Sequence, residues 1–138
     1  MKAYDAAYFR RWYHNPRTRI DSATSLRGKV FLAVSVAEYI LGRRIRTVLD
    51  VGCGEARWRA PLRELRPNVS YLGLDPSAYI VRRFGRSHHV RRGGLGTLRD
   101  LEGAAAYDLI VCADVIQYVD TRELRRGLRE IRRLLGGV

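Results

Sequence analysis

The fold of this 138-residue chain is decided by ten residues, Thr47-Val48-Leu49-Asp50-Val51-Gly52-Cys53-Gly54-Glu55-Ala56. The first half is rich in apolar and β-branched residues, which predicts a buried strand over Thr47–Val51. The second half begins with a glycine turn at Gly52 and Gly54. Glycine has no Cβ and tolerates positive φ, so the backbone of such a turn can approach a ligand closely. The stretch therefore predicts a strand that runs into a glycine turn, with Asp50 just before the turn.

A second strand is predicted downstream, over Val69–Leu74, and it ends in Asp75. A glycine turn after one strand and an acid at the end of the next form a nucleoside-binding arrangement, because the carboxylate can accept hydrogen bonds from both ribose hydroxyls. Two ligands fit, a dinucleotide or S-adenosylmethionine. The dinucleotide pattern places a third glycine where this chain has Arg57, and Asp50 would repel a pyrophosphate. An acid at position 50 suits a ligand with a cationic amino-acid tail.

Three segments carry a resemblance to class I S-adenosylmethionine-dependent methyltransferases: VLDVGCGEA at 48–56, YLGLDPS at 71–77 and YDLIVCADVIQYV at 107–119. They resemble, in order, the first motif, the acidic end of the second strand and the fourth-strand segment of that family. The resemblance implies an α/β fold, a doubly wound Rossmann-like parallel sheet with strand order 3-2-1-4. It also implies S-adenosyl-L-methionine as cofactor and methyl transfer to an acceptor that the sequence does not identify. Ligands of such sheets bind over the carboxyl ends of the strands.

The resemblance assigns roles to individual residues. The cofactor-binding residues that it implies in the core are Asp50, Gly52, Cys53, Gly54, Asp75, Pro76, Ser77, Thr97 and Ala113. The backbone of the glycine turn would pass under the methionine portion of the cofactor. Asp50 would orient that turn and favour the ammonium group, and Asp75 would accept from the ribose. Thr97 stands near the adenine, where the family often has an acid.

The methyl-transfer side of the site is implied to lie after the fourth strand, beside Ala113 and Asp114. Asp114 is the candidate catalytic base, and Tyr118 is the alternative. Many relatives have a Glu-His pair where this chain has Gln117-Tyr118, so a common acid–base pair is absent. In-line methyl transfer depends chiefly on positioning. The pattern of histidines and cysteines predicts no metal site.

The N-terminal run YDAAYFRRWYHN at 4–15 spaces Tyr4, Tyr8 and Trp12 on one face of a helix. It resembles a segment that precedes the core in some small methyltransferases and folds over the cofactor. Tyr8 and Trp12 would then contact the cofactor, because aromatic faces attract a sulfonium. The alternative is that these rings only pack the helix on the domain. The expected organisation is one methyltransferase-like domain, with N-terminal helices and a lid over 1–45 and a cofactor-binding core over 46–138.

The remaining elements follow from periodicity and capping residues. Helices are predicted over Lys29–Leu41, Trp58–Leu65, Ala78–Phe84 and Leu98–Leu101, and strands over His88–Arg91 and Tyr107–Cys112. A last helix is predicted after Asp120, its N-cap, with Glu123 as the N3 residue, an arrangement close to a capping box. Its expected apolar stripe is Leu124, Leu128, Ile131 and Leu135.

The net charge of +12 is carried almost entirely by arginine, since Lys2 and Lys29 are the only lysines among 26 basic residues. One interpretation is an anionic partner such as RNA or DNA. The favoured interpretation is a compositional bias toward arginine, because the arginines are scattered along every segment. The chain has no long apolar run and no signal-peptide pattern, so it is expected to be cytoplasmic and not to bind a membrane. Cys53 and Cys112 are expected to be reduced thiols.

The sequence stops after Leu134-Leu135-Gly136-Gly137-Val138, where the resembled family enters a fifth strand. The C-terminal strands of the family are therefore expected to be missing. The fourth strand would then be an open edge, which is a pairing liability. Either a missing C-terminal segment or a partner is expected to cover it, and a fragment of a longer protein is favoured. Two rival functions remain open: an NAD-binding oxidoreductase domain, and a non-catalytic nucleic-acid-binding module on the same fold.

Overall fold

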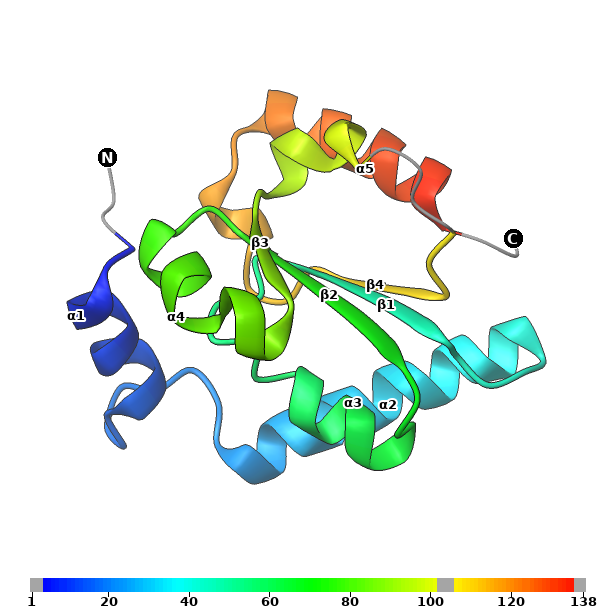
Figure 1. The fold of residues 1–138 in the computed structure, drawn as a ribbon, viewed down its shortest axis with the longest axis horizontal. Coiled ribbons are helices and arrows are strands. Elements are labelled where there is room, and N and C mark those ends of the chain that lie inside the picture. The colour runs from blue at the N-terminus through cyan, green and yellow to red at the C-terminus, as the bar shows by residue number, and fades with distance from the viewer. Residues whose placement is uncertain (1–3, 102–105, 136–138) are drawn as a thin grey trace.

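A four-stranded parallel sheet is the centre of the computed structural model, which describes residues 4–101 and 106–135 (Figure 1). The strands are β1 Thr47–Val51, β2 Ser70–Asp75, β3 Val90–Arg92 and β4 Leu109–Val111. Their order is β3-β2-β1-β4, and every adjacent pair is parallel. The predicted fold class and strand order are confirmed.

Helices cover both faces of this sheet (Figure 1). One face carries α2 Ala23–Leu41, α3 Arg59–Leu65 and α4 Ala78–His88, preceded by α1 Ala6–Phe9 and the π-helix η1 Arg10–His14. The other carries the 3₁₀-helix η2 Leu95–Asp100 and α5 Thr121–Leu134, and a 3₁₀ turn η3 Ile116–Tyr118 follows β4. Each face of the sheet has its own hydrophobic core, and β1 contributes to both. Val48 packs in the core with α2 and α3, whereas Leu49 and Val51 pack in the core with η2 and α5. Burial on both faces explains the nearly continuous apolar sequence of this strand.

Several element boundaries differ from the predictions for identifiable reasons. α2 begins at Ala23 rather than Lys29, because Ser22 accepts a hydrogen bond from the Ser25 N–H and caps the helix there. α4 does not end at Gly85. It continues to His88, and His89 ends it in the left-handed conformation, with φ of 57°. The third strand is consequently displaced toward the C-terminus.

Two of the predicted helices expose apolar residues in the structure. Leu128 of α5 is 54% exposed, and the buried position at the end of that helix is Leu134. Ile40 of α2 is 66% exposed, and Leu32, Val36 and Tyr39 are exposed on the same helix. The free edge of β4 has only an isolated parallel bridge between residues 107 and 135, within the described part of the chain. That a further segment or a partner covers this edge remains a prediction.

Candidate functional site

The strands end at a cavity of about 570 Å³. Its walls come from four parts of the chain: the N-terminal aromatic residues, the ends of β1 and β2, residues 92–97, and the segment after β4. A smaller cavity of about 70 Å³ adjoins the glycine turn and includes Asp50, Cys53 and Ala113 in its walls. Tyr8, Tyr13, Gly52, Asp114 and Tyr118 line both cavities. The site therefore has two compartments with a common wall at the carboxyl ends of the strands.

Asp75 lines the larger cavity and joins the glycine turn to the start of α4. One carboxylate oxygen accepts the Gly54 N–H at 2.9 Å, and the other accepts the Ser77 N–H at 2.9 Å. Burial raises the pKa of Asp75, and these two backbone hydrogen bonds oppose that rise. Each carboxylate oxygen has a second lone pair. Asp75 thus positions the glycine turn and can still accept hydrogen bonds from a ligand in the cavity.

Asp50 lies behind the glycine turn and is almost completely buried. Burial raises its pKa to about 7, while a 2.7 Å hydrogen bond from the Tyr71 hydroxyl opposes the shift and the charge of Asp75 adds to it. Gly73 pairs with Asp50 across the two strands, and any larger side chain at Gly73 would collide with the Cys53 sulfur. Tyr71 was not predicted as a site residue, because its contact with Asp50 follows from the strand register.

The turn itself has alternating residues at positive φ: Gly52 at 74°, Gly54 at 52° and Ala56 at 54°. The third such residue is Ala56, which is not a glycine. A Cβ on Gly52 would collide with Val115, and one on Gly54 would collide with the Tyr13 hydroxyl. The segment after β4 and the N-terminal segment therefore both pack directly on the turn.

Tyrosines from the N-terminal segment meet Tyr118 over the cavity. The rings of Tyr4 and Tyr8 lie edge to face at 5.1 Å between centroids, and those of Tyr4 and Tyr118 at 6.3 Å. The pKa of Tyr8 is raised by burial and by a hydrogen bond with Tyr118. His14 Nε2 lies 2.9 Å from the Glu55 carboxylate and links the end of the segment to the glycine turn. These contacts hold the segment across the site.

The structure separates the two predicted lid residues. Tyr8 lines both cavities, whereas Trp12 lines neither. The Arg11 guanidinium lies over the Trp12 ring, 5.1 Å from the ring centroid. Tyr13 takes the position at the site instead, and burial raises its pKa. Residues 10–14 form a π-helix, whose turn is one residue longer than that of an α-helix. The longer turn brings positions 8 and 13 together, and the α-helical spacing used for the prediction missed this.

Other predicted residues divide by what they contact. Pro76 and Thr97 line the larger cavity, although the Thr97 hydroxyl is bonded to the backbone of Gly94. Ser77 is buried and lines neither cavity. Its hydroxyl accepts from the Ile80 N–H as the cap of α4 and donates to the Tyr4 carbonyl. The structure thus gives Ser77 a supporting place behind the cavity wall.

Asp114 lies where the two cavities meet. It has a φ of 56°, a conformation that only a few per cent of residues other than glycine adopt. Its carboxylate is exposed and has no hydrogen-bond or ion-pair partner within residues 4–101 and 106–135. Arg92 and Glu123 also line the larger cavity, and no sequence motif had indicated either as a site residue. The Glu123 carboxylate accepts a hydrogen bond from the Gly96 N–H at 3.1 Å.

A glycine turn, an acid bonded to that turn and a cavity at the carboxyl ends of parallel strands define the nucleoside-binding class of α/β domains. Within that class, residues 49–137 match the family described as Methyltransferase domain. The match covers well over half of the chain, and the chain belongs to this family. A comparison with curated protein sequences finds no match.

Solved methyltransferase structures share the fold. The sugar N-methyltransferase KedS8 from Streptoalloteichus sp. ATCC 53650 superposes with a TM-score of 0.68 at 20% identity, over 98% of this chain and 51% of that one. A SAM-dependent methyltransferase from Archaeoglobus fulgidus gives 0.64 at 15% identity, over 94% and 52%. The plantazolicin methyltransferase BpumL, solved with SAH and a desmethyl analogue, gives 0.64 at 16%, over 94% and 53%. This chain therefore spans about half the length of these enzymes.

Three further features of the described residues concern metal sites, disulfides and membrane-spanning helices. No group of three or more histidine, cysteine or acidic side chains among them has the arrangement of a metal site. Cys53 and Cys112 are free thiols. None of the described helices combines the length and the apolar character that crossing a bilayer requires.

The raised pKa of Asp50 predicts a characteristic pH dependence of stability. A folded-state pKa near 7 lies above the ordinary value of about 3.9, so stability is fully present below about pH 4 and is lost as the pH rises to about 7. Asp50→Asn keeps the shape and removes the charge. We expect wild-type stability, relative to Asp50→Asn, to fall between these pH values by up to about 1.4 kcal/mol per unit. Urea unfolding of both ligand-free proteins from pH 4 to 8 measures this, and parallel curves would contradict it.

Proposed function

We propose that this chain forms the cofactor half of an S-adenosylmethionine-dependent methyltransferase that methylates an unidentified acceptor. The observation that carries the proposal is the Asp75 carboxylate, held by the Gly54 and Ser77 N–H groups at the wall of a cavity of about 570 Å³. That volume lies within the usual range of small-molecule sites. S-adenosylmethionine, when bound, supplies an electrophilic methyl group on a sulfonium.

The residues present fit the parts of this cofactor. Asp75 would accept from the ribose hydroxyls, and residues 93–97 would border the adenine. Asp50 borders the smaller compartment, and its buried carboxyl has a pKa near 7, which a neighbouring ammonium group would lower. The folded chain thus spends free energy on a buried acid that a cationic ligand would stabilise. A pyrophosphate has the opposite charge, which disfavours the NAD-binding alternative.

Asp114 is the residue that we assign to the acceptor side. Its carboxylate is exposed at the meeting point of the two cavities and is not committed to a protein partner among the described residues. Its left-handed backbone costs on the order of 1 kcal/mol, and such strain is concentrated at functional sites. Asp114 would orient the acceptor and remove its proton. Tyr118 is poorly suited to that role, because its hydroxyl is engaged with Tyr8.

The acceptor-binding region is expected to need more than these residues. The chain spans about half of the solved methyltransferases that share its fold. The edge of β4 that pairs with no further strand among the described residues leads directly into the segment that carries Asp114. A further segment or a partner covering this edge would supply the rest of the acceptor site.

Removing the Asp75 carboxylate should weaken cofactor binding. Loss of hydrogen bonds to a charged acceptor costs about 1.5–3 kcal/mol, which corresponds to roughly ten- to a hundredfold in the dissociation constant. Calorimetric titration of Asp75→Ala and wild type with S-adenosylmethionine and S-adenosylhomocysteine measures this. Asp108→Ala is the matched control, because Asp108 also accepts backbone N–H groups but at the opposite end of the sheet. Equal affinities in all three proteins would remove Asp75 from the site, and no binding of either ligand by folded wild type would refute the proposed cofactor.

The lid role of the N-terminal segment predicts different effects for its two aromatic residues. Tyr8→Ala removes a ring and a hydroxyl from both cavities, and we expect at least a severalfold weaker affinity for S-adenosylmethionine, since exposed cation–π contacts contribute about 0.5–1 kcal/mol. Trp12→Ala should leave affinity unchanged, because Trp12 lines neither cavity. The same titrations distinguish them. Unchanged binding by a folded Tyr8→Ala protein would refute the lid.

Asp114→Asn should leave cofactor affinity unchanged and slow methyl transfer. General-base catalysis typically contributes about 10²–10⁴-fold. Transfer of radiolabelled methyl from S-adenosylmethionine to a panel of amines, phenols and thiols provides the readout. Glu123→Gln is the control, because Glu123 also lines the cavity but is bonded to Gly96. Undiminished transfer by Asp114→Asn would exclude Asp114 as the base.

A further inference from the structure

A third hollow, of about 330 Å³, lies outside the two cavities described above, between α3 and the start of β2. We call it the α3 groove. Ser70 begins β2 and borders this groove, whereas Asp75 ends the same strand at the larger cavity. At about 3.3 Å per residue the two ends are roughly 17 Å apart. The groove is therefore distinct from the site described above.

The polar side chains of the α3 groove are all donors or cations. Its walls include Arg59, Arg63, Asn68, Ser70 and His89, and none of its lining residues is acidic. Not one of these five side chains has a hydrogen-bond or ion-pair partner among the described residues. Elsewhere between α2 and α3 the pattern differs, since Arg27 pairs with Glu64 and Arg66 pairs with Glu38. The protein thus neutralises the neighbouring charges but leaves those of the groove unpaired.

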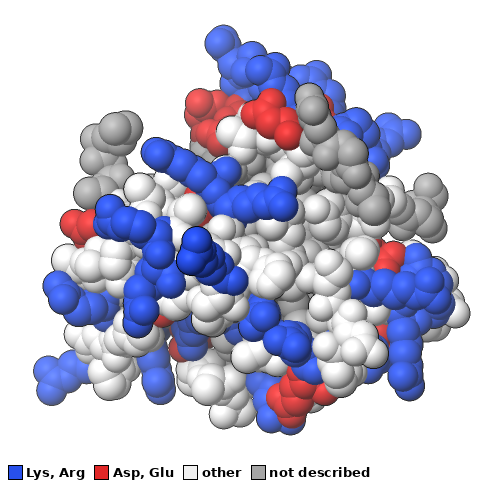
Figure 2. Space-filling model, viewed as in Figure 1, with Lys and Arg blue, Asp and Glu red and all other residues white. Residues whose placement is uncertain are grey.

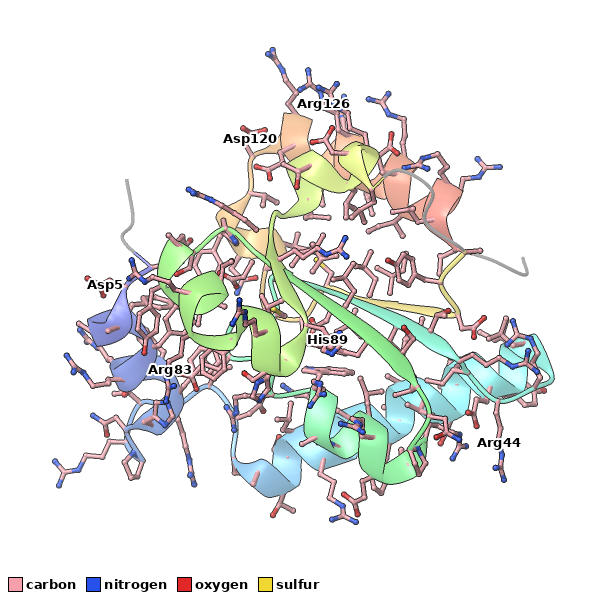
Figure 3. The ribbon with its side chains drawn as sticks, viewed as in Figure 1. Asp5, Arg44, Arg83, His89, Asp120 and Arg126 are labelled. Carbon is pink, nitrogen blue, oxygen red and sulfur yellow. The ribbon has the colours of Figure 1, made fainter. Side chains whose placement is uncertain are left out.

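The positions of these groups follow from the fold. Arg59 and Arg63 are one helical turn apart on α3, so their side chains project from the same face. His89 ends α4 and has a left-handed backbone conformation. Figure 3 shows His89 close to the strands beside α3. Burial and the nearby Arg59 guanidinium lower the pKa of His88, the neighbour of His89 in sequence, so the charge of Arg59 acts at this junction. Figure 2 shows the same side of the molecule, where blue side chains far outnumber red ones.

We propose that the α3 groove is a binding site for a phosphate-bearing anion. Two guanidinium groups match the geometry of phosphate oxygens, and hydroxyl, amide and imidazole groups can donate alongside them. The anion would relieve the repulsion between cations that have no counter-charge in the described chain. The ligand chemistry is the same whether the phosphate is free or belongs to the backbone of a single-stranded nucleic acid.

The experiment compares three proteins: wild type, Arg59→Gln/Arg63→Gln and Arg125→Gln/Arg126→Gln. The last pair is the control, because both arginines are exposed on α5, across the sheet from the groove, and have no ion pair among the described residues (Figures 1 and 3). The probes are inorganic phosphate, read as the rise in melting temperature over chloride at equal ionic strength, and a fluorescein-labelled oligouridylate, read by anisotropy. Arg63→Gln alone is included, because Arg63 is exposed and its loss should not disturb folding.

We expect at least one probe to bind wild type and the α5 control equally and the groove variant about tenfold more weakly. Stabilisation by phosphate would identify a free phosphate as sufficient. Binding of the oligouridylate alone would identify a polymer backbone, and the slope of log affinity against log salt should then decrease by about 1.4 in the groove variant. No binding of either probe, or equal losses in the groove and α5 variants, would overturn the proposal.

Discussion

The arrangement of the whole site depends on one carboxylate that accepts two backbone hydrogen bonds. Asp75 bonds to Gly54 on one side and to Ser77 on the other, so it joins the turn after β1 to the start of α4. Both bonds stabilise the ionised form against the burial that raises the pKa of Asp75. The two hydrogen bonds thus oppose the effect of burial on this pKa, and a side chain without two acceptor oxygens would leave at least one of the N–H groups without an acceptor. The same carboxylate therefore joins two segments of the chain and lines the larger cavity.

The second acid of the site faces the opposite situation. Asp50 receives one hydrogen bond, from Tyr71, and burial keeps its pKa near 7. Its neighbour across the strands is Gly73, and a side chain at that position would collide with the Cys53 sulfur. The two acids thus differ in how many hydrogen bonds their carboxyl oxygens accept from the protein. Among the described residues, Asp50 has a single hydrogen-bond donor and a raised pKa, whereas Asp75 has one backbone donor on each oxygen and keeps a second lone pair on each.

The sequence predicted the features that depend on local pattern. The strand Thr47–Val51, the acid at the end of the second strand and the cap at Asp120 are encoded within a few neighbouring residues, and the structure has all three. Contacts that depend on register or on helix type were not predictable in this way. The bond from Tyr71 to Asp50 requires knowing which residues face one another across the strands. The place of Tyr13 at the site requires the π-helical turn over Arg10–His14.

The distribution of charge also becomes clear only in three dimensions. The sequence shows a net charge of +12, with arginines in every segment, and their scatter favours a compositional origin. In the folded chain they are not equivalent, because some are paired with acids and others are not. Arg43 contacts Asp108 and Arg66 contacts Glu38, and these pairs bind α2 to the sheet and to α3. A compositional bias accounts for how many arginines there are, but it does not account for two unpaired ones converging with other donors on one groove. Placement, rather than number, is therefore the property that selection for a binding site would leave behind.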